Sequence, residues 1–171
     1  ASAGKVVDRS VQTLQNRTDR FVSAQTSSDL IADVAGIDIR EDDPQTDAYL
    51  ANHYNETNHT EGKGLNKLKL QKLLGLPVDK DVFLLGMVSR MTDQKGFDLI
   101  AYVMDEMCQD AVQFVILGTG DERYENMFRH FDWKYHGKVS AQIYYDEPMS
   151  HRIYAASDAF LMPSLFEPCG L

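Results

Sequence analysis

Cysteine is scarce in this sequence, which has only Cys108 and Cys169 among its 171 residues. Two isolated cysteines are too few for a disulfide framework, and they do not make a four-ligand zinc site. No other clustering of metal-ligating residue types stands out along the chain. We therefore expect reduced thiols, a cytoplasmic protein and no metal site.

Long apolar runs are also absent. No window of about 18 apolar residues occurs, so we expect no membrane span. The first residues, ASAGKVVDRSVQTLQ, lack the apolar core of a secretory signal. Basic residues are outnumbered, with 17 Lys and Arg against 26 Asp and Glu and a net charge of −9. This balance argues against a broad nucleic-acid surface, but it leaves room for a small basic pocket that holds a phosphorylated metabolite.

The apolar fraction of 43% is typical of a globular protein, and the length suits a single domain. Residues 5–25 carry apolar side chains at alternating spacings of four and three, which predicts an amphipathic N-terminal helix. Residues 36–62 are polar and weakly periodic, which predicts loop with short turns. The stretch NKLKLQKLLGLP predicts a second helix that ends at Gly75.

From residue 82 onward, short apolar runs alternate with helical stretches. Such runs are typical of strands that are buried on both faces of a parallel sheet. The sequence therefore predicts an α/β fold, namely a Rossmann-like parallel sheet with flanking helices, preceded by the N-terminal helix. The four predicted strands are VFLLGMV at 82–88, VQFVIL at 112–117, KVSAQIYY at 138–145 and AFLM at 159–162.

Ligands bind such sheets outside the carboxyl ends of the strands, so the loops after the strands are the candidate site. The first loop, SRMTDQKGF, holds Arg90 and Lys95 before a helix that begins near Gly96. An arginine fork, a lysine charge and a helix N-terminus together suit a phosphate group. Spacing alone leaves an equal alternative, in which both cations are solvated loop charges.

The second and third loops are less specific. Gly118 and Gly120 in GTGDERYE allow close backbone approach, but a plain turn explains them as well, and the third glycine of a dinucleotide fingerprint is missing. Tyr145 in YDEPMSHR could stack on a base or could be a simple rim tyrosine. His151 and Arg152 follow on the next helix, where they could line the pocket mouth or lie on the surface.

The fourth loop, SLFEPCGL, places Glu167 just past a predicted strand, beside Gly170. A carboxylate in that position can accept hydrogen bonds from sugar hydroxyls, and backbone N–H groups near a glycine can meet phosphate. A bland turn remains an alternative for these letters in isolation. Because parallel strands end at one edge, we expect Arg90, Lys95, Tyr145 and Glu167 to converge there.

Taken in order, these segments resemble the bacterial glycogen synthase and plant starch synthase family. The resemblance rests on AGIDIREDDPQTDAYLANHY, GMVSRMTDQKGFDLI, FVILGTGDERYE and YYDEPMSHRIYAASDAFLMPSLFEPCGL, and runs from about Leu30 to Leu171. Members of that family are retaining glucosyltransferases of the GT-B fold, with two Rossmann-like domains that face each other across a cleft. The resemblance implies that residues 30–171 are part of the C-terminal domain, which binds the nucleotide-sugar donor.

The resemblance also implies roles for individual residues. Arg90 and Lys95 match the pair that binds the donor diphosphate and neutralises the departing ADP. Tyr145 matches the residue that stacks on adenine, and Glu167 matches the acidic residue that holds glucose and assists its transfer. The remaining expected donor contacts are Gly118, Gly120, Cys169, Gly170 and Leu171. The implied reaction moves glucose from ADP-glucose to the non-reducing end of an α-1,4-glucan, with no cofactor.

Three departures from the family pattern limit these expectations. The first Rossmann-like domain is absent from the sequence, the second domain is truncated after FEPCGL, and residues 1–29 do not resemble the family. A complete cleft needs both domains to exclude water. We therefore expect the chain alone to be inactive in glucan elongation. The alternative is a non-catalytic module, or a fusion scaffold, derived from the same domain.

Overall fold

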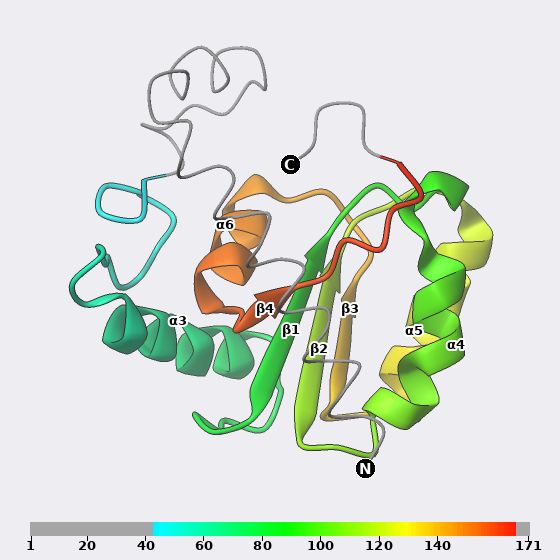
Figure 1. Cartoon of the computed structure of the whole chain (residues 1–171), viewed down its shortest axis with the longest axis horizontal. Coiled ribbons are helices and arrows are strands. Elements are labelled where there is room, and N and C mark those ends of the chain that lie inside the picture. The colour runs from blue at the N-terminus through cyan, green and yellow to red at the C-terminus, as the bar shows by residue number, and fades with distance from the viewer. Residues whose placement is uncertain (1–42, 167–171) are drawn as a thin grey trace. The chain divides into compact units, whose positions relative to one another are not determined.

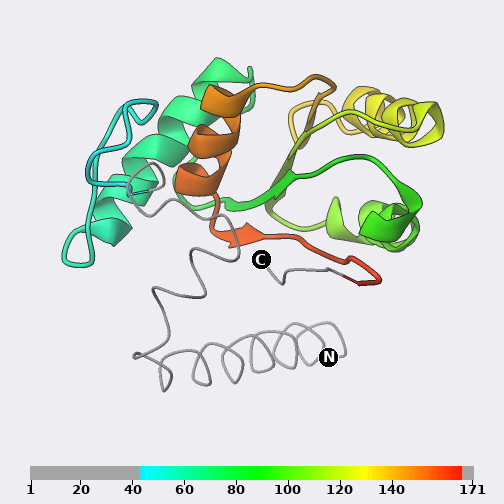
Figure 2. The same ribbon diagram turned by 90° about the horizontal axis from the view of Figure 1, so that it is seen from above.

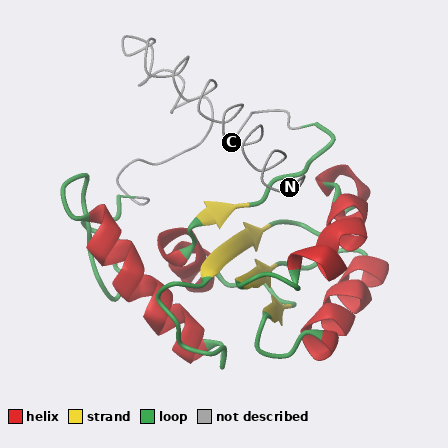
Figure 3. Cartoon of the chain, turned by 60° about the horizontal axis from the view of Figure 1, so that its bottom comes forward, coloured by secondary structure: helices red, strands yellow, loops and turns green. Residues whose placement is uncertain are grey.

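The computed structural model describes residues 43–166, which form a four-stranded parallel sheet with helices on both faces (Figures 1 and 3). The α/β Rossmann-like fold predicted from the sequence is confirmed. The helix predicted over residues 5–25 lies outside the described residues. So do Glu167, Cys169, Gly170 and Leu171 of the predicted site.

The sheet has the strand order β3-β2-β1-β4, and every pair of neighbours is parallel. Its strands are β1 (Phe83–Val88), β2 (Val112–Leu117), β3 (Val139–Gln142) and β4 (Ala159–Phe160). The last two are shorter than predicted. Strand β3 stops because its partner β2 ends at Leu117, which pairs with Gln142. After β4 the Leu161 amide still donates to the Gly86 carbonyl, at 2.9 Å, but Pro163 has no N–H group to continue the pairing.

The helices are α3 (His59–Leu73), α4 (Phe97–Met107), α5 (Glu122–Lys134) and α6 (Glu147–Ala156), with a 3-10 turn, η1 (Asp93–Lys95), before α4. The predicted loop over 36–62 is wrong at its end, because α3 begins at His59. The first turns of α3, HTEGKG, are too polar to show helical periodicity. Gly75, with φ of 70°, follows the end of α3 as predicted. Within residues 43–166, no helix combines the length and apolarity that crossing a membrane requires.

The two faces of the sheet carry separate apolar cores, because side chains alternate along each strand. Leu85 and Met87 of β1 face the core made with α4 and α5, whereas Leu84 faces the core made with α3 and α6. The largest fully buried side chains of the first core are Phe97, Phe114, Phe128, Met87, Met91, Met104 and Ile116. The sheet therefore lies between two apolar cores, which fix the positions of its strand ends.

Figures 2 and 3 show the helices in two layers, with α4 and α5 on one side of the sheet and α3 and α6 on the other. Right-handed crossovers produce this arrangement. The chain steps from β1 to β2 to β3 in one direction, and then returns through α6 to β4 on the other side of β1. Helix α6 packs closely on β1, since a Cβ at Gly86 would overlap the Ser157 hydroxyl.

The segment before α3 is attached to α6 by a buried acid–imidazole contact. The Asp47 carboxylate lies 2.7 Å from Nδ1 of His151, and the two side chains are 5% and 13% exposed. Arg152 Nε donates to the Tyr49 carbonyl at 3.3 Å. The sequence allowed two positions for His151, at the mouth of a ligand pocket or on the surface. The structure shows neither, because His151 is mostly buried against Asp47. It holds the first described segment in place.

Two glycines of α3 provide a matched test of packing on the helix. A Cβ at Gly62 would overlap the Cβ of Tyr54, whereas a Cβ at Gly64 would meet no atom within 4 Å. We expect Gly64→Ala to raise the free energy of unfolding by roughly 0.5–1 kcal/mol, because alanine is the better helix former. Gly62→Ala should lower it by roughly 1–3 kcal/mol through overpacking. Urea denaturation of both variants measures the difference, and equal shifts would contradict the close contact with Tyr54.

Candidate functional site

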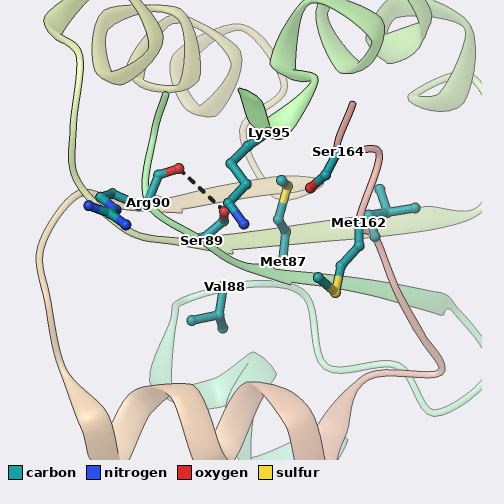
Figure 4. A pocket seen from close by; sticks show the side chains of 8 residues that line it. Met87, Val88, Ser89, Arg90, Lys95, Met162 and Ser164 are labelled. Carbon is teal, nitrogen blue, oxygen red and sulfur yellow. Dashed lines mark hydrogen bonds between the residues drawn. The ribbon is translucent and has the colours of Figure 1, made fainter. Parts of the chain in front are cut away.

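A pocket of about 260 Å³ lies at the carboxyl ends of β1 and β4 (Figure 4). The topology explains its position. The connections from β1 and from β4 leave the sheet edge in different directions where the strand order reverses, and such switch points open a crevice. The pocket is lined by Met87, Val88, Ser89, Arg90, Lys95, Leu161, Met162 and Ser164.

The lining combines two cations and two hydroxyls with an apolar floor. Arg90 is exposed and Lys95 is half-buried, and Figure 4 shows the Lys95 side chain reaching toward Ser89. The Ser89 hydroxyl donates to the Arg90 carbonyl at 3.3 Å. None of the described lining residues is an Asp or a Glu. A planar guanidinium, an ammonium group and hydroxyl groups in one pocket suit a phosphorylated ligand.

The one acidic residue in the Arg90–Lys95 loop is neutralised elsewhere. Asp93 forms an ion pair with Arg123 and accepts a hydrogen bond from the Tyr124 hydroxyl at 2.8 Å. Arg123 in turn donates to that hydroxyl at 2.8 Å, and burial raises the pKa of Tyr124. Asp93 is therefore engaged by side chains of helix α5.

The loop that carries Arg90 is held by the loop after β2. Parallel pairing continues past the strand ends, because Ser89 N–H donates to the Leu117 carbonyl at 3.0 Å and Met91 N–H donates to the Thr119 carbonyl at 2.8 Å. A Cβ at Gly118 would overlap the Ser89 carbonyl oxygen. The glycine thus permits the backbone contact that supports the pocket.

Gly120 has a similar structural role. A Cβ there would overlap the Met91 carbonyl oxygen, and the Gly120 N–H donates to the Glu125 carboxylate at 3.1 Å. This backbone hydrogen bond is the main reason that the pKa of Glu125 is lowered, with Arg129 adding to it. The Gly120 amide is therefore already engaged by helix α5. The expected contact of Gly118 and Gly120 with a nucleotide-sugar ligand stays a prediction.

The structure brings Arg90 and Lys95 together, but it separates Tyr145 from them. Tyr145 follows β3, which lies two strands away from β1, and its side chain is 86% exposed. It shares the carboxyl edge of the sheet without lining the described pocket. Glu167, the fourth residue expected there, lies outside the described residues. The roles given to all four residues stay predictions.

Some features of the pocket were not expected from the sequence. Ser89 and Ser164 line it, and both could have been found, since Ser89 directly follows β1 and Ser164 lies in the segment after β4 at the same edge. The N-terminus of α4 was expected to contribute, but no residue of α4 is among the described lining residues. The η1 turn intervenes, and Gly96 caps α4 with φ of 70°.

Within residues 43–166, no group of three or more His, Cys, Asp and Glu residues is arranged to hold a metal ion. Cys108 is buried at the C-terminal end of α4, and burial raises the pKa of its thiol. The pocket at β1 and β4 combines cations and hydroxyl groups at the sheet edge where such folds bind ligands.

The fold and the pocket together define a Rossmann-like domain with a cationic pocket at the carboxyl edge of its sheet. Comparison with known families agrees, because residues 82–171, just over half of the chain, match the model of the family "Glycosyl transferases group 1". The chain belongs to this family.

Curated relatives are glycogen synthases. The chain is 64% identical over 138 residues to the glycogen synthase of Lachnospira eligens, which covers 81% of the chain and 29% of that protein. It is 50% identical over 145 residues to the glycogen synthase of Clostridium novyi, covering 85% of the chain and 30% of that protein. The chain thus spans less than a third of the length of these relatives.

A solved structure is similar too. The catalytic domain of Starch Synthase IV from Arabidopsis thaliana, bound to ADP and acarbose, superposes with a TM-score of 0.72 at 38% identity. The match covers 79% of this chain and 28% of that one. The resemblance to glycogen and starch synthases noted from the sequence is confirmed.

Proposed function

We propose that residues 30–171 are the donor-binding part of a cytoplasmic glucosyltransferase that elongates an α-1,4-glucan from ADP-glucose with retention at the anomeric carbon. The observation that carries this proposal is the pairing of Arg90 and Lys95 in one pocket at the β1–β4 switch point. Identity of up to 64% to glycogen synthases supports the choice of reaction. The acceptor α-glucan and a second Rossmann-like domain belong to the same proposal.

In this proposal, Arg90 and Lys95 bind the diphosphate of the donor. When the bond from glucose to the diphosphate breaks, negative charge develops on the leaving oxygen, and fixed cations stabilise it. The Ser89 and Ser164 hydroxyls supply neutral donors beside them. Pairing of β1 with β2, continued by the Ser89 and Met91 backbone hydrogen bonds, holds the backbone that carries Arg90.

Pocket size agrees with a partial donor site. A volume of about 260 Å³ lies just below the roughly 300–1,000 Å³ typical of small-molecule pockets. It suits a diphosphate with part of a sugar rather than a whole nucleotide sugar. Strand β3, which Tyr145 follows, lies two strand spacings from β1, or about 10 Å, and an extended nucleotide diphosphate is long enough to span that distance. The base would then stack on Tyr145 and the glucose would lie toward Glu167.

Calorimetric titration of the chain with ADP, UDP, ADP-glucose and UDP-glucose tests this proposal. We expect ADP and ADP-glucose to bind, and the uridine ligands to bind at least about tenfold more weakly, which is about 1.4 kcal/mol. Inorganic sulfate serves as the control for a purely electrostatic anion site. A folded chain that binds none of the four nucleotides would instead favour the non-catalytic module or scaffold.

A further inference from the structure

Two segments form the walls of the pocket, namely the Arg90–Lys95 loop and the segment after β4. Gln94 connects them through its side-chain amide and its backbone carbonyl. Its side-chain amide nitrogen donates to the Phe166 carbonyl at 2.9 Å. Its own backbone carbonyl accepts from the Leu165 N–H at 2.9 Å. Gln94 lies in η1, between Arg90 and Lys95, whereas Leu165 and Phe166 belong to the segment after β4. One residue of the phosphate-side loop thus holds two consecutive residues of the opposite wall.

A second contact lies two residues further along the same loop. A Cβ at Gly96 would overlap the Pro163 carbonyl oxygen, so the two backbones approach each other closely here. Lys95 lies between Gln94 and Gly96 and lines the pocket, as do Met162 and Ser164 on the other side. The two walls are therefore joined directly beside the residue that carries the pocket's lysine charge.

Burial contributes little to holding the segment after β4. The side chains of Leu165 and Phe166 are 72% and 65% exposed, so the hydrophobic effect does not fix them. Strand β4 is only two residues long, and Pro163 interrupts backbone donation beyond it. In the described residues, the backbone hydrogen bond that follows the one at Leu161 along this segment is the one from Leu165 to Gln94.

We propose that Gln94 is a positioning residue, which sets the backbone of residues 163–166 in register with the Arg90–Lys95 loop. The inference rests on the proposed function, because it takes residues 162–166 as the wall on the sugar side of the site. In the proposed function, ADP needs the Arg90–Lys95 loop and Tyr145, whereas the glucose of ADP-glucose also needs the segment after β4. Gln94 therefore acts on binding of the sugar more than on binding of the nucleotide.

Gln94→Met tests the proposal, because methionine keeps the length of the side chain and removes the amide donor. Gln109→Met is the matched control, since the Gln109 amide makes a long 3.4 Å contact to the Asp105 carbonyl away from the pocket. Hydrogen–deuterium exchange of peptides covering residues 161–171 should become about fivefold faster in Gln94→Met, as expected for the loss of one hydrogen bond. Gln109→Met should leave this exchange unchanged.

Calorimetry on the same proteins separates positioning from general loosening. We expect Gln94→Met to weaken ADP-glucose binding by about fivefold, to change ADP binding by less than about twofold, and to leave the unfolding midpoint close to that of Gln109→Met. Unchanged exchange would overturn the inference, and so would equal losses for the two ligands. If the unmodified chain binds neither nucleotide, the proposed function fails, and the exchange result alone decides whether Gln94 anchors the segment.

Discussion

Replacement of Arg90 by alanine should weaken ADP binding by at least about tenfold. Arg90 lines the pocket, and no acid among the described lining residues competes for its guanidinium. A hydrogen bond between charged groups contributes roughly 1.5–3 kcal/mol, which corresponds to about 10- to 150-fold in affinity. Calorimetric titration with ADP measures the loss directly.

Arg129→Ala is the matched control, because it removes the same charge from the surface of α5, where Arg129 pairs with Glu125 at 3.0 Å. ADP affinity should change by less than about twofold there, since solvent screens distant charges. Glu167→Ala should spare ADP, which has no glucose, and weaken ADP-glucose. An equal loss of ADP affinity in the Arg90 and Glu167 variants would contradict the assigned roles.

Lys67→Met should lower the free energy of unfolding by roughly 2–4 kcal/mol. The Lys67 side chain is 7% exposed, and its ammonium group lies 2.5 Å from the Asp158 carboxylate and 3.0 Å from the Val82 carbonyl. Removing one partner of a fully buried ion pair costs about 3–5 kcal/mol, and the value is reduced here because Asp158 is 31% exposed. Asp158 also accepts from the Leu84 N–H at 2.7 Å, so β1 would lose support as well.

Lys134→Met provides the comparison for this effect. Lys134 pairs with Asp105 at 2.9 Å, but the two side chains are 38% and 64% exposed. Exposed pairs contribute about 0–1 kcal/mol. Guanidinium chloride denaturation of both variants measures the two costs. A loss at Lys67 no larger than the loss at Lys134 would show that the buried pair does not stabilise the fold.

The sheet was predictable because its strands are buried on both faces and therefore appear as short apolar runs in the sequence. The lengths of β3 and β4 were not, since they depend on where β2 ends and on the single proline at 163. The early start of α3 was missed because its first turns are stabilised by packing on Tyr54 rather than by an apolar stripe.

The pocket was partly predictable for a topological reason. Parallel strands deliver their following loops to one edge, so Arg90 and Lys95 could be expected there, but strand order decides which loops meet. The order β3-β2-β1-β4 separates Tyr145 from the pocket, and nothing in the local sequence indicates this strand order. The hydrogen bond between Gln94 and Phe166 joins residues 72 positions apart, so the sequence around either residue does not predict it.

The pairing of β4 with β1, which lies far back along the chain, has a consequence for how the domain assembles. Pairing of β4 with β1 brings together residues such as Leu84 and Asp158, which are 74 positions apart, whereas β1, β2 and β3 pair with strands next along the chain. Closing the longer loop costs more chain entropy and gains only two paired residues. The pocket should therefore be the last part of this sheet to form during folding and the first to open, so brief protease treatment should cut near residues 157–166 before the β1–β2–β3 core.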